Sequence, residues 1–465
     1  MVVFSTYSRE RLGAALVLMT ITAGCAPETV HRAPQFPFKD HYATGVGSAP
    51  IVVSNTAWWR ALNEPTLDRL IDAALVGSPD IALARERITE TEALVAAISS
   101  PASLESDLQV RHESDLEGSS ATIGQASLSF DWLLDPWGSR RAQRKGAMAR
   151  VEAADAELDA ARLLLIQNVA NAYIELRYQQ RLYTVRRQEL TARRQTLGLV
   201  RRLFDSDSAT RLDVLAAQAR LAETEAVLPG IKAAIQVQKY RIAVLVGRAP
   251  GDLGIDLDRD AHQPVATLAP NIGIPADMVR NRPDIRIADR LYYAALSDVD
   301  QARAALYPSL SLTGMITLSA IDGSGADAYF GPVLSLPALP GSPRKARVAV
   351  QESRAQQAMQ SWKSTVLDAL LEVETSLVNY IGAHGAISAS RRSVDLYRQT
   401  VTLTRELVTG DGATLRDLVD AEVAVSDAEL ALAANLRQLA LAYVSLNLAL
   451  GSGSQYGIQT ASTGG

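Results

Sequence analysis

The chain has 465 residues and a formal net charge of -5, with 48% hydrophobic, 21% charged and 5% aromatic residues. This mild acidity argues against a nucleic-acid-binding protein, because such proteins carry a basic patch or stripe. Few aromatic residues beside abundant Ala, Leu, Arg and Glu favour long helices over a large conventional core, so we expect a mainly helical protein.

The first residues are typical of a targeting segment. Arg9 and Arg11 precede an apolar stretch at 12–21, and the small residues 22–24 stand immediately before Cys25, as at a signal-peptide cleavage site. The apolar stretch is too short to span a bilayer as a mature helix. Because Cys25 is the single cysteine, it cannot belong to an intrachain disulfide framework.

The Ala-Gly-Cys sequence at 23–25 resembles a bacterial lipoprotein lipobox, which implies that Cys25 carries a covalent lipid and becomes the new N-terminus. Ala26 follows, rather than the aspartate that often retains lipoproteins at the inner membrane, so the resemblance favours the outer membrane. A plain secretory signal with an incidental cysteine is the alternative. The segment 25–57 is rich in proline and glycine, which predicts an extended tether.

Helical spacing of apolar residues begins near Trp58 and continues to residue 97, with an interruption at Pro79. Its counterpart at 278–306 is interrupted at Pro283. After each of these segments the period of the apolar residues changes from 3.6 to 2, which indicates strands.

Four strands are predicted by this alternation. The clearest spans 309–319, where leucine and isoleucine alternate with serine and threonine, and 126–132 alternates in the same way. Weaker partners at 104–113 and 328–336 complete one hairpin in each half of the chain. Pro332 restricts the last strand to an edge.

Segments of about ten residues with one apolar and one polar face are what a transmembrane β-barrel requires. A soluble antiparallel sheet with one solvated face is the alternative. Four strands cannot close a barrel by themselves, and lipid does not tolerate an open sheet edge. If these strands lie in a membrane, several chains must therefore pool them.

The longest helical run, 138–203, contains no proline and would be about 100 Å long at 1.5 Å per residue. A seven-residue spacing of mostly apolar residues indicates coiled-coil packing at Val169, Leu176, Tyr183, Leu190, Leu197 and Phe204, and again at Val373, Tyr380, Ile387, Val394, Val401 and Val408. The run 138–203 and its counterpart in the second half of the chain are the two long helices, and short polar breaks at 205–208 and 409–412 end them. Returning helices follow, the first with an expected kink at Pro229, so each half forms a long helical hairpin. An ordinary coiled-coil rod is the alternative.

The second half of the chain repeats the first at an offset of about 204 residues, which implies two copies of one large module. The repeated features include Pro79-Asp80-Ile81 and Pro283-Asp284-Ile285, Thr210 with Asp213 and Thr414 with Asp417, and Gly247 and Gly451. We expect a signal peptide at 1–24 and a lipidated tether at 25–57. The first repeat would span 58–250, with strands at about 104–133 and a helical hairpin at about 138–247. After a linker at 251–274, the second repeat would span 275–452, with strands at about 309–337 and a hairpin at about 343–450, followed by a flexible tail at 453–465.

Three segments carry a family resemblance: Arg-Pro-Asp-Ile at 282–285 leading to 304–314, Trp-Leu-Leu-Asp-Pro-Trp-Gly at 132–138, and Leu-Asp-Val-Leu-Ala-Ala-Gln at 212–218. They resemble the outer membrane factor family of TolC-like channels, and more closely its lipoprotein branch of the NodT type. The resemblance implies a homotrimer with one 12-stranded outer-membrane β-barrel, continued by a long periplasmic α-helical barrel. Its implied partners are a periplasmic adaptor (membrane fusion protein), an inner-membrane RND-type transporter and outer-membrane lipid.

By this resemblance the chain is the exit duct of a tripartite efflux pump for drugs, toxic compounds or metals. The alternatives are a type I protein secretion channel and a periplasmic coiled-coil lipoprotein without a pore. The five histidines have no metal-ligand spacing, and no catalytic motif has supporting context. We therefore expect neither an enzyme nor a metal, and no cofactor other than the covalent lipid on Cys25.

The resemblance also implies that Asp417 and Asp420 face the pore at its periplasmic entrance, where a carboxylate ring attracts cations. Helix capping is the competing interpretation, because Thr210 with Asp213 and Thr414 with Asp417 have the spacing of a capping box. We favour a cap for Asp213, both roles for Asp417, and the gate for Asp420. The expected adaptor contacts are Phe204, Asp205, Asp207, Thr210, Val408, Gly410, Asp411 and Thr414.

Basic residues cluster just after the strands, where they suit lipid phosphates, and a solvated helix face explains them at least as well. They are Arg140, Arg141, Arg144, Lys145, Arg344, Lys345 and Arg347. A second basic group, Arg186, Arg187, Arg193 and Arg194, is interpreted as a solvated face.

Overall fold

The computed structural model describes residues 36–39, 41–43, 57–99, 101–114, 120–259, 262–266, 281–320, 325–337, 341–409 and 412–454. The predicted signal peptide, Cys25 and the end of the chain after residue 454 lie outside the described residues. The chain divides into two units. The strand unit contains the described parts of 86–155 and 286–364, and the hairpin unit contains those of 37–85, 156–285 and 365–465.

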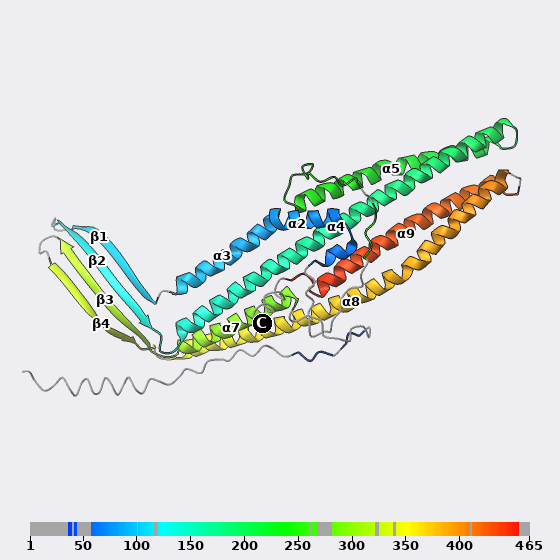
Figure 1. The fold of residues 1–465 in the computed structure, drawn as a ribbon. Coiled ribbons are helices and arrows are strands. Elements are labelled where there is room, and N and C mark those ends of the chain that lie inside the picture. The colour runs from blue at the N-terminus through cyan, green and yellow to red at the C-terminus, as the bar shows by residue number, and fades with distance from the viewer. Residues whose placement is uncertain are drawn as a thin grey trace, which may run out of the picture. The chain divides into compact units, whose positions relative to one another are not determined.

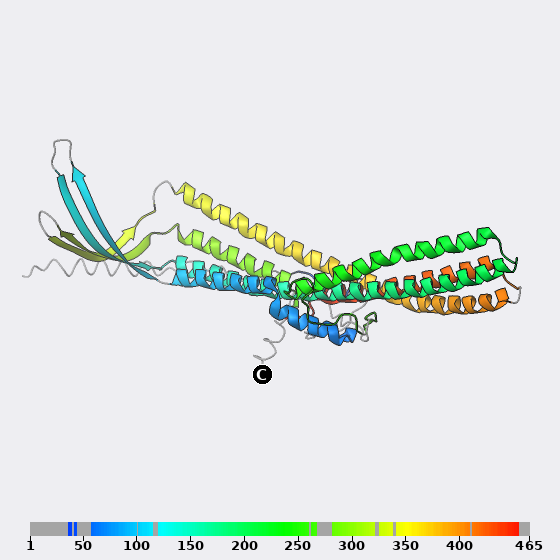
Figure 2. The same cartoon turned by 90° about the horizontal axis from the view of Figure 1, so that it is seen from above.

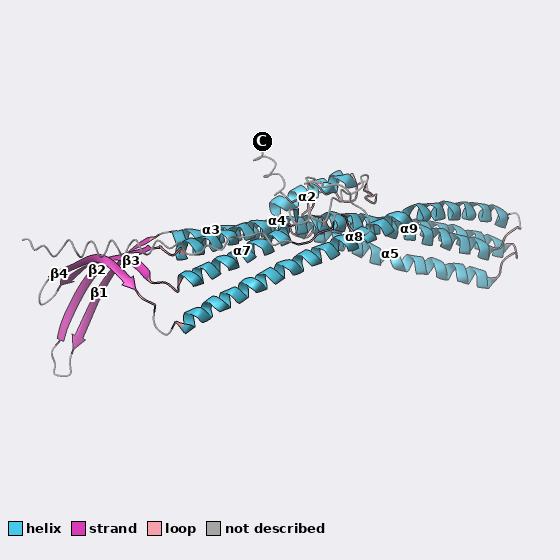
Figure 3. Cartoon of the chain, turned by 90° about the horizontal axis from the view of Figure 1, so that it is seen from below, coloured by secondary structure: helices cyan, strands magenta, loops and turns pink. Residues whose placement is uncertain are grey.

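The strand unit holds one antiparallel sheet in the order β1-β2-β3-β4, which is coloured magenta in Figure 3. Its strands are β1 (Ala102–Ser114), β2 (Ser120–Leu134), β3 (Ser309–Ala320) and β4 (Gly325–Ser335). The four predicted strands are confirmed. Strands β2 and β3 pair across the two halves of the chain, with Leu128 opposite Ile316. Pro332 lies in the outer strand β4, where its missing N–H does not interrupt a ladder on both sides.

Parts of four helices complete the strand unit: α3 (Pro79–Ser99), α4 (Ser139–Asp205), α7 (Pro283–Ala304) and α8 (Ser342–Thr409). Three ion pairs of 2.7 Å join α7 to its neighbours: Arg150 with Asp298, Arg290 with Glu152, and Arg303 with Glu352. Because these side chains are partly exposed, the pairs fix the alignment of the helices more than they add to stability.

The hairpin unit contains the two predicted helical hairpins, which lie side by side in Figures 1 and 2. The long helix α4 returns through α5 (Arg211–Leu245), and α8 returns through α9 (Leu415–Ala449). Helix α4 has 67 residues, or about 100 Å at 1.5 Å per residue. Helix α5 continues on both sides of Pro229 as one helix.

The predicted seven-residue seam is buried over most of its length. On α4, Val169 and Leu176 are fully covered, and on α8 Val373 and Val394 are nearly so. At the tip end the seam emerges, because Phe204 is 40% exposed. The seam therefore packs the hairpins together below the tips.

The core of the hairpin unit forms where the short helices η1 (Trp58–Leu62) and α2 (Pro65–Gly77) cover the long ones. Trp58, Leu67 and Ile71 pack there with Tyr173 of α4 and Val444 of α9. Burial of such large apolar side chains is the main stabilising contribution available to a chain with few aromatics.

A buried arginine holds the segment after α5 against α4. Arg177 is fully buried and donates to the carbonyl oxygens of Leu257 (3.0 Å) and Arg259 (3.2 Å). Gln180 donates to the same Leu257 oxygen at 2.8 Å. These bonds satisfy backbone groups that would otherwise lack partners in the core.

Two glycines related by the sequence repeat follow the returning helices. Gly247 has a φ of 79°, and a Cβ added there would lie 2.0 Å from the carbonyl oxygen of Gly77. Gly451 has a φ of 71°, and its Cβ would lie 2.8 Å from the backbone of Asn281. Both positions require glycine, because the backbone conformation and the close approach each exclude a side chain.

We therefore expect Gly247→Ala to lower the free energy of unfolding by roughly 2 kcal/mol or more, since it combines left-handed strain with a backbone clash. The urea midpoint of the purified protein measures the change. Gly230→Ala is the matched control, because it lies inside α5 and an added Cβ meets nothing within 4 Å. The control should be neutral or up to about 1 kcal/mol more stable. Equal midpoints for Gly247→Ala and the wild type would contradict this account.

Candidate functional site: a two-faced sheet and two helical tips

The register of the sheet collects its apolar side chains on one face. Residues of one strand alternate between the two faces, and Leu104 lies opposite Phe130, which lies opposite Gly314. The large exposed apolar residues on this face are Leu104, Leu108, Val110, Leu128, Trp132, Ile316, Leu318, Phe330 and Leu334. Leu108 is 77% exposed. A contiguous apolar surface of this kind marks a contact with lipid or with protein.

The opposite face is predominantly polar. It carries serine and threonine from β2 and β3, with the carboxylates of Glu105, Asp107, Asp131 and Asp327. Arg111 adds a positive charge on the same face. The sheet can therefore separate an apolar medium from water.

The outer strands β1 and β4 each pair on one side only within the described residues. Each thus presents a row of backbone N–H and C=O groups that can pair with a strand of another chain. The sheet has one apolar face and two open edges.

The two helical tips share one backbone geometry. Ser208 N–H donates to the carbonyl oxygen of Leu203 at 2.8 Å, and Gly412 N–H donates to that of Leu407 at 2.8 Å. Asp207 adopts a φ of 58° in the first tip. Two of the predicted adaptor contacts in the second tip, Gly410 and Asp411, lie outside the described residues.

Both predicted capping boxes are confirmed. The Thr210 hydroxyl donates to the Asp213 carboxylate at 2.6 Å, and Asp213 N–H donates back to that hydroxyl at 3.3 Å. Thr414 and Asp417 form the same pair, with distances of 2.6 Å and 3.2 Å. Asp213 and Asp417 thus both begin a returning helix.

The threonine hydroxyl and backbone N–H of each box lower the pKa of Asp213 and of Asp417 below the ordinary aspartate value. A lowered pKa keeps the carboxylate charged at neutral and mildly acidic pH. The caps therefore retain their full contribution above the unfolded-state pKa and lose it as pH falls through the lowered value.

Asp420 lies outside the cap. Its side chain is 62% exposed, and its carboxylate is 3.8 Å from the Arg416 guanidinium one turn earlier. Among the predicted contacts of the first tip, Phe204, Asp205 and Asp207 are exposed. The sequence analysis did not single out Leu212 and Leu215 as contacts, yet both are exposed apolar residues in the first turns of α5.

A buried charge cluster lies near the tips. It contains Glu189, Arg193 and Thr196 of α4, Arg405 of α8, and Glu422 and Ser426 of α9. The Glu422 carboxylate is 4% exposed and accepts a hydrogen bond from Thr196 at 3.1 Å, with Arg193 at 3.5 Å and Arg405 at 3.4 Å. The cluster joins the first hairpin to the second.

Further along α9, Glu429 lies between Arg398 of α8 at 2.6 Å and Arg181 of α4 at 3.3 Å. Glu422, Ser426 and Glu429 have spacings of four and three residues, so they share one face of α9. That face is held against both long helices by charged groups.

The prediction that Arg193 belongs to a solvated helix face was wrong, because Arg193 is buried against Glu422 and Glu189. Arg187 and Arg194 are exposed as predicted, and Arg186 is half-buried beside Glu189. The spacing of charged residues along one helix does not show which face of that helix another helix will cover. The spacing of Glu422 and Glu429 on α9 was the available signal.

Within the described residues, no group of three or more His, Cys, Asp or Glu side chains is arranged to hold a metal ion. Across the same part of the chain, none of the helices contains an apolar stretch long enough to cross a membrane.

Known proteins share this architecture. Nodulation protein T of Rhizobium leguminosarum bv. viciae is 32% identical over 449 residues, which cover 95% of this chain and 93% of the relative. The pyoverdine export outer membrane protein OpmQ of Pseudomonas aeruginosa is 27% identical over 86% of this chain and 87% of its own length. The solved structure of the outer-membrane channel OprN matches with a TM-score of 0.83 at 27% identity, over 93% of this chain and 100% of the other. These similarities identify an outer-membrane channel.

A family model described as outer membrane efflux protein matches the chain twice, at 70–248 and at 274–452. The chain belongs to the outer membrane efflux protein family. The two matched stretches are offset by about 204 residues, as the internal repeat requires. As predicted, the chain is an efflux channel protein and not an enzyme.

The buried charge cluster makes a prediction about stability. Glu422→Gln should lower the free energy of unfolding by roughly 2 to 4 kcal/mol, because it leaves Arg193 buried with only the more distant Glu189 as a partner. Chemical denaturation of the purified protein measures the loss.

The control is Glu225→Gln, which removes the partner of Arg194 from an exposed pair of 2.9 Å in the first hairpin. That change should stay within about 0.5 kcal/mol, because solvent screens exposed pairs. Similar small effects of both substitutions would show that burial of the cluster contributes nothing.

Proposed function

We propose that three copies of the chain pool their strands into one 12-stranded β-barrel in the outer membrane. The observation that carries this proposal is the sheet, which has one apolar face and two open edges. Pairing of β1 of one copy with β4 of the next supplies hydrogen-bond partners for the backbone N–H and C=O groups at both edges. Such partners are required in lipid, where no water is present to supply them. The apolar face then faces lipid and the polar face lines the interior.

The size of a barrel supports three copies over two. Two copies would supply eight strands, and the interior of an eight-stranded barrel is filled by side chains or holds one small ligand. Barrels of 16 to 18 strands leave an aqueous channel, so 12 strands fall in the range that begins to leave an open bore. A lining of carboxylates and hydroxyls suits water and solutes in that bore.

The proposed role is the exit duct of a tripartite efflux pump. The long hairpins would continue the barrel into the periplasm and present the tips to a periplasmic adaptor, a membrane fusion protein that connects to an inner-membrane RND-type transporter. The relative named for pyoverdine export favours export of small molecules over type I protein secretion. Cys25 would carry the lipid anchor, which acyl labelling of the wild type, but not of Cys25→Ser, would test.

The tips would control entry. Threefold symmetry would turn Asp417 and Asp420 into rings of carboxylates, which attract cations and repel anions at a constriction. The pair of Glu422 with Arg193 would hold the second hairpin against the first, and the pair of Glu422 with Arg405 would hold α9 against α8 within the second hairpin. Exposed Phe204, Leu212 and Leu215 supply an apolar patch for an adaptor contact.

Reconstitution into planar bilayers tests the channel. The purified full-length protein should have the mass of about three chains and give discrete conductance steps. Conductance should persist in Asp417→Asn/Asp420→Asn, because the bore of the proposed barrel does not depend on charges at the tip. A monomeric mass, together with no conductance even in this double variant, would support a rod without a pore.

Asp420→Asn should reduce the preference for cations, seen as a reversal potential nearer to zero in a KCl gradient. The preference that remains should persist as pH falls into the ordinary aspartate range, because hydrogen bonds from Thr414 lower the pKa of Asp417. Glu225→Gln, which removes an exposed carboxylate on α5, is the control and should leave the reversal potential unchanged. An unchanged value for Asp420→Asn as well would count against its place at the entrance.

A further inference from the structure

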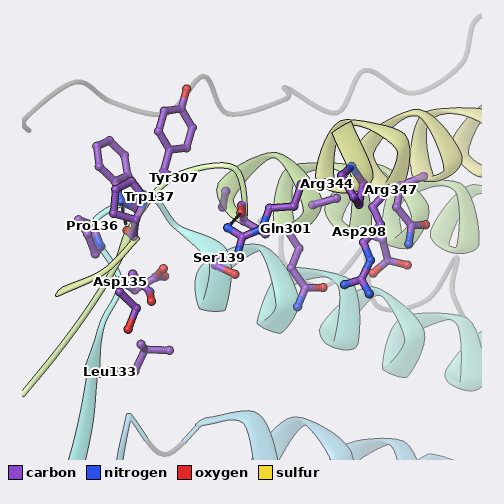
Figure 4. A pocket seen from close by; sticks show the side chains of 18 of the residues that line it. Leu133, Asp135, Pro136, Trp137, Ser139, Asp298, Gln301, Tyr307, Arg344 and Arg347 are labelled. Carbon is purple, nitrogen blue, oxygen red and sulfur yellow. Dashed lines mark hydrogen bonds between the residues drawn. The ribbon is translucent and has the colours of Figure 1, made fainter. Parts of the chain in front are cut away.

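A cavity of about 850 Å³ lies within the strand unit, where the sheet meets the helices. Figure 4 shows Leu133 at the end of β2, with Asp135 and Trp137 just after the strand, on one side, and Asp298, Arg344 and Arg347 from α7 and α8 on the other. Leu134, the last residue of β2, and Leu336, which directly follows β4, also line the cavity. The cavity therefore has an apolar side toward the sheet and a charged side toward the helices.

Three arginines of α8 line the cavity: Arg344, Arg347 and Arg354. Their spacings of three and seven residues place them on one side of the helix. Arg344 donates to the carbonyl oxygen of Ala305 at 3.1 Å. Within the described part of the chain, the side chains of Arg347 and Arg354 have no hydrogen bond or ion pair.

The acidic residues of the cavity are already engaged. Asp298 pairs with Arg150 at 2.7 Å, and Asp135 accepts a hydrogen bond from the backbone N–H of Arg141 at 3.0 Å. Arg347 and Arg354 thus supply positive charge that these carboxylates do not neutralise. Guanidinium groups bind phosphate oxygens with paired hydrogen bonds, so an anion of phosphate type is the chemistry that fits.

Two aromatic residues mark this level of the strand unit. The rings of Trp137 and Tyr307 stack with centroids 4.6 Å apart, and the Trp137 indole N–H donates to the carbonyl oxygen of Pro308 at 2.8 Å. Tyr307 is 43% exposed. Paired aromatic rings with a polar edge are enriched at the boundary between lipid and water.

The apolar face of the sheet also ends at the cavity. Leu134 pairs with Leu310, and Leu310 pairs with Leu334, so these leucines continue the apolar face to the last residues of the strands. If that face lies in lipid, as the proposed function requires, the phosphate groups of the adjoining leaflet lie at the level of the arginines. A lipid could then keep its acyl chains on the apolar face and its headgroup in the cavity.

We propose that this cavity binds the phosphate headgroup of an anionic glycerophospholipid, with Arg347 and Arg354 as its ligands and its acyl chains beside Leu134 and Leu336. The proposal rests on the proposed membrane position of the sheet. A free phosphate ion would leave most of a cavity of about 850 Å³ unfilled and would make no use of its apolar side.

The test uses the full-length protein purified in a neutral detergent. Binding of dihexanoyl phosphatidylglycerol, dihexanoyl phosphatidylcholine and inorganic phosphate is measured separately by titration calorimetry. We expect phosphatidylglycerol to bind. Phosphatidylcholine and inorganic phosphate should each bind at least about tenfold more weakly, because phosphatidylcholine has no net negative charge and inorganic phosphate has no acyl chains.

Arg347→Gln/Arg354→Gln should weaken phosphatidylglycerol binding by about tenfold or more, since two positive charges facing the phosphate are lost. Arg344 is kept because it holds the Ala305 carbonyl. Arg391→Gln/Arg392→Gln is the matched control, because both arginines are exposed on the same helix outside the cavity. The control should bind phosphatidylglycerol like the wild type.

Three results would overturn the proposal. They are equal binding of inorganic phosphate, equal loss in the two double variants, and no binding of phosphatidylglycerol to the wild type. The last result does not depend on how the variants fold. Conductance of the same preparations separates this proposal from the proposed function: a protein that conducts but does not bind the lipid refutes only the headgroup site, and one that binds without conducting refutes only the channel.

Discussion

The backbone groups along the two open edges of the sheet constrain everything else in this molecule. Strands β1 and β4 each have one side without a partner in the described chain, beside a face of exposed leucine, isoleucine and phenylalanine. In water, the backbone groups of the edges would find hydrogen-bond partners, but exposure of the apolar face would be unfavourable. In lipid, the apolar face would be favourable, but the backbone groups of the edges would lack partners. The proposed closure with further copies would resolve both conflicts. The helices that continue from these strands would then follow the symmetry of the closed sheet.

The parts of this fold that the sequence predicted depend on local periodicity. Alternation at 309–319 is interrupted only by Met315, because each strand must keep one face apolar, so this strand can be predicted without knowing its neighbours. The proline-free run after residue 138 likewise predicted α4, which ends at Asp205. Each capping box, at Thr210 and at Thr414, lies within four consecutive residues, and the structure contains both.

Features that join distant segments could not be predicted in the same way. Arg193 and Glu422 are 229 positions apart, and each has the sequence context of an exposed helix face. Their burial depends on which helices meet, and the heptad spacing does not specify the partner. The same holds for Arg177, whose acceptors lie in an irregular segment about 80 residues later. The cavity beside Arg347 also escaped prediction, because its lining comes from six helices and strands of both halves of the chain.

The close approaches of Gly247 to Gly77 and of Gly451 to Asn281 have a mechanical consequence. At each point a returning helix ends beside the break where another helix of the chain begins, α3 after Gly77 and α7 after Asn281. The backbone hydrogen-bond ladders of those helices stop there, whereas α4 and α8 continue without interruption. Among the described helices, a torque applied along the hairpins must therefore pass through α4 and α8. The two glycine contacts thus join helix ends that no continuous backbone hydrogen-bond ladder connects, and a larger side chain at either position would force those ends apart.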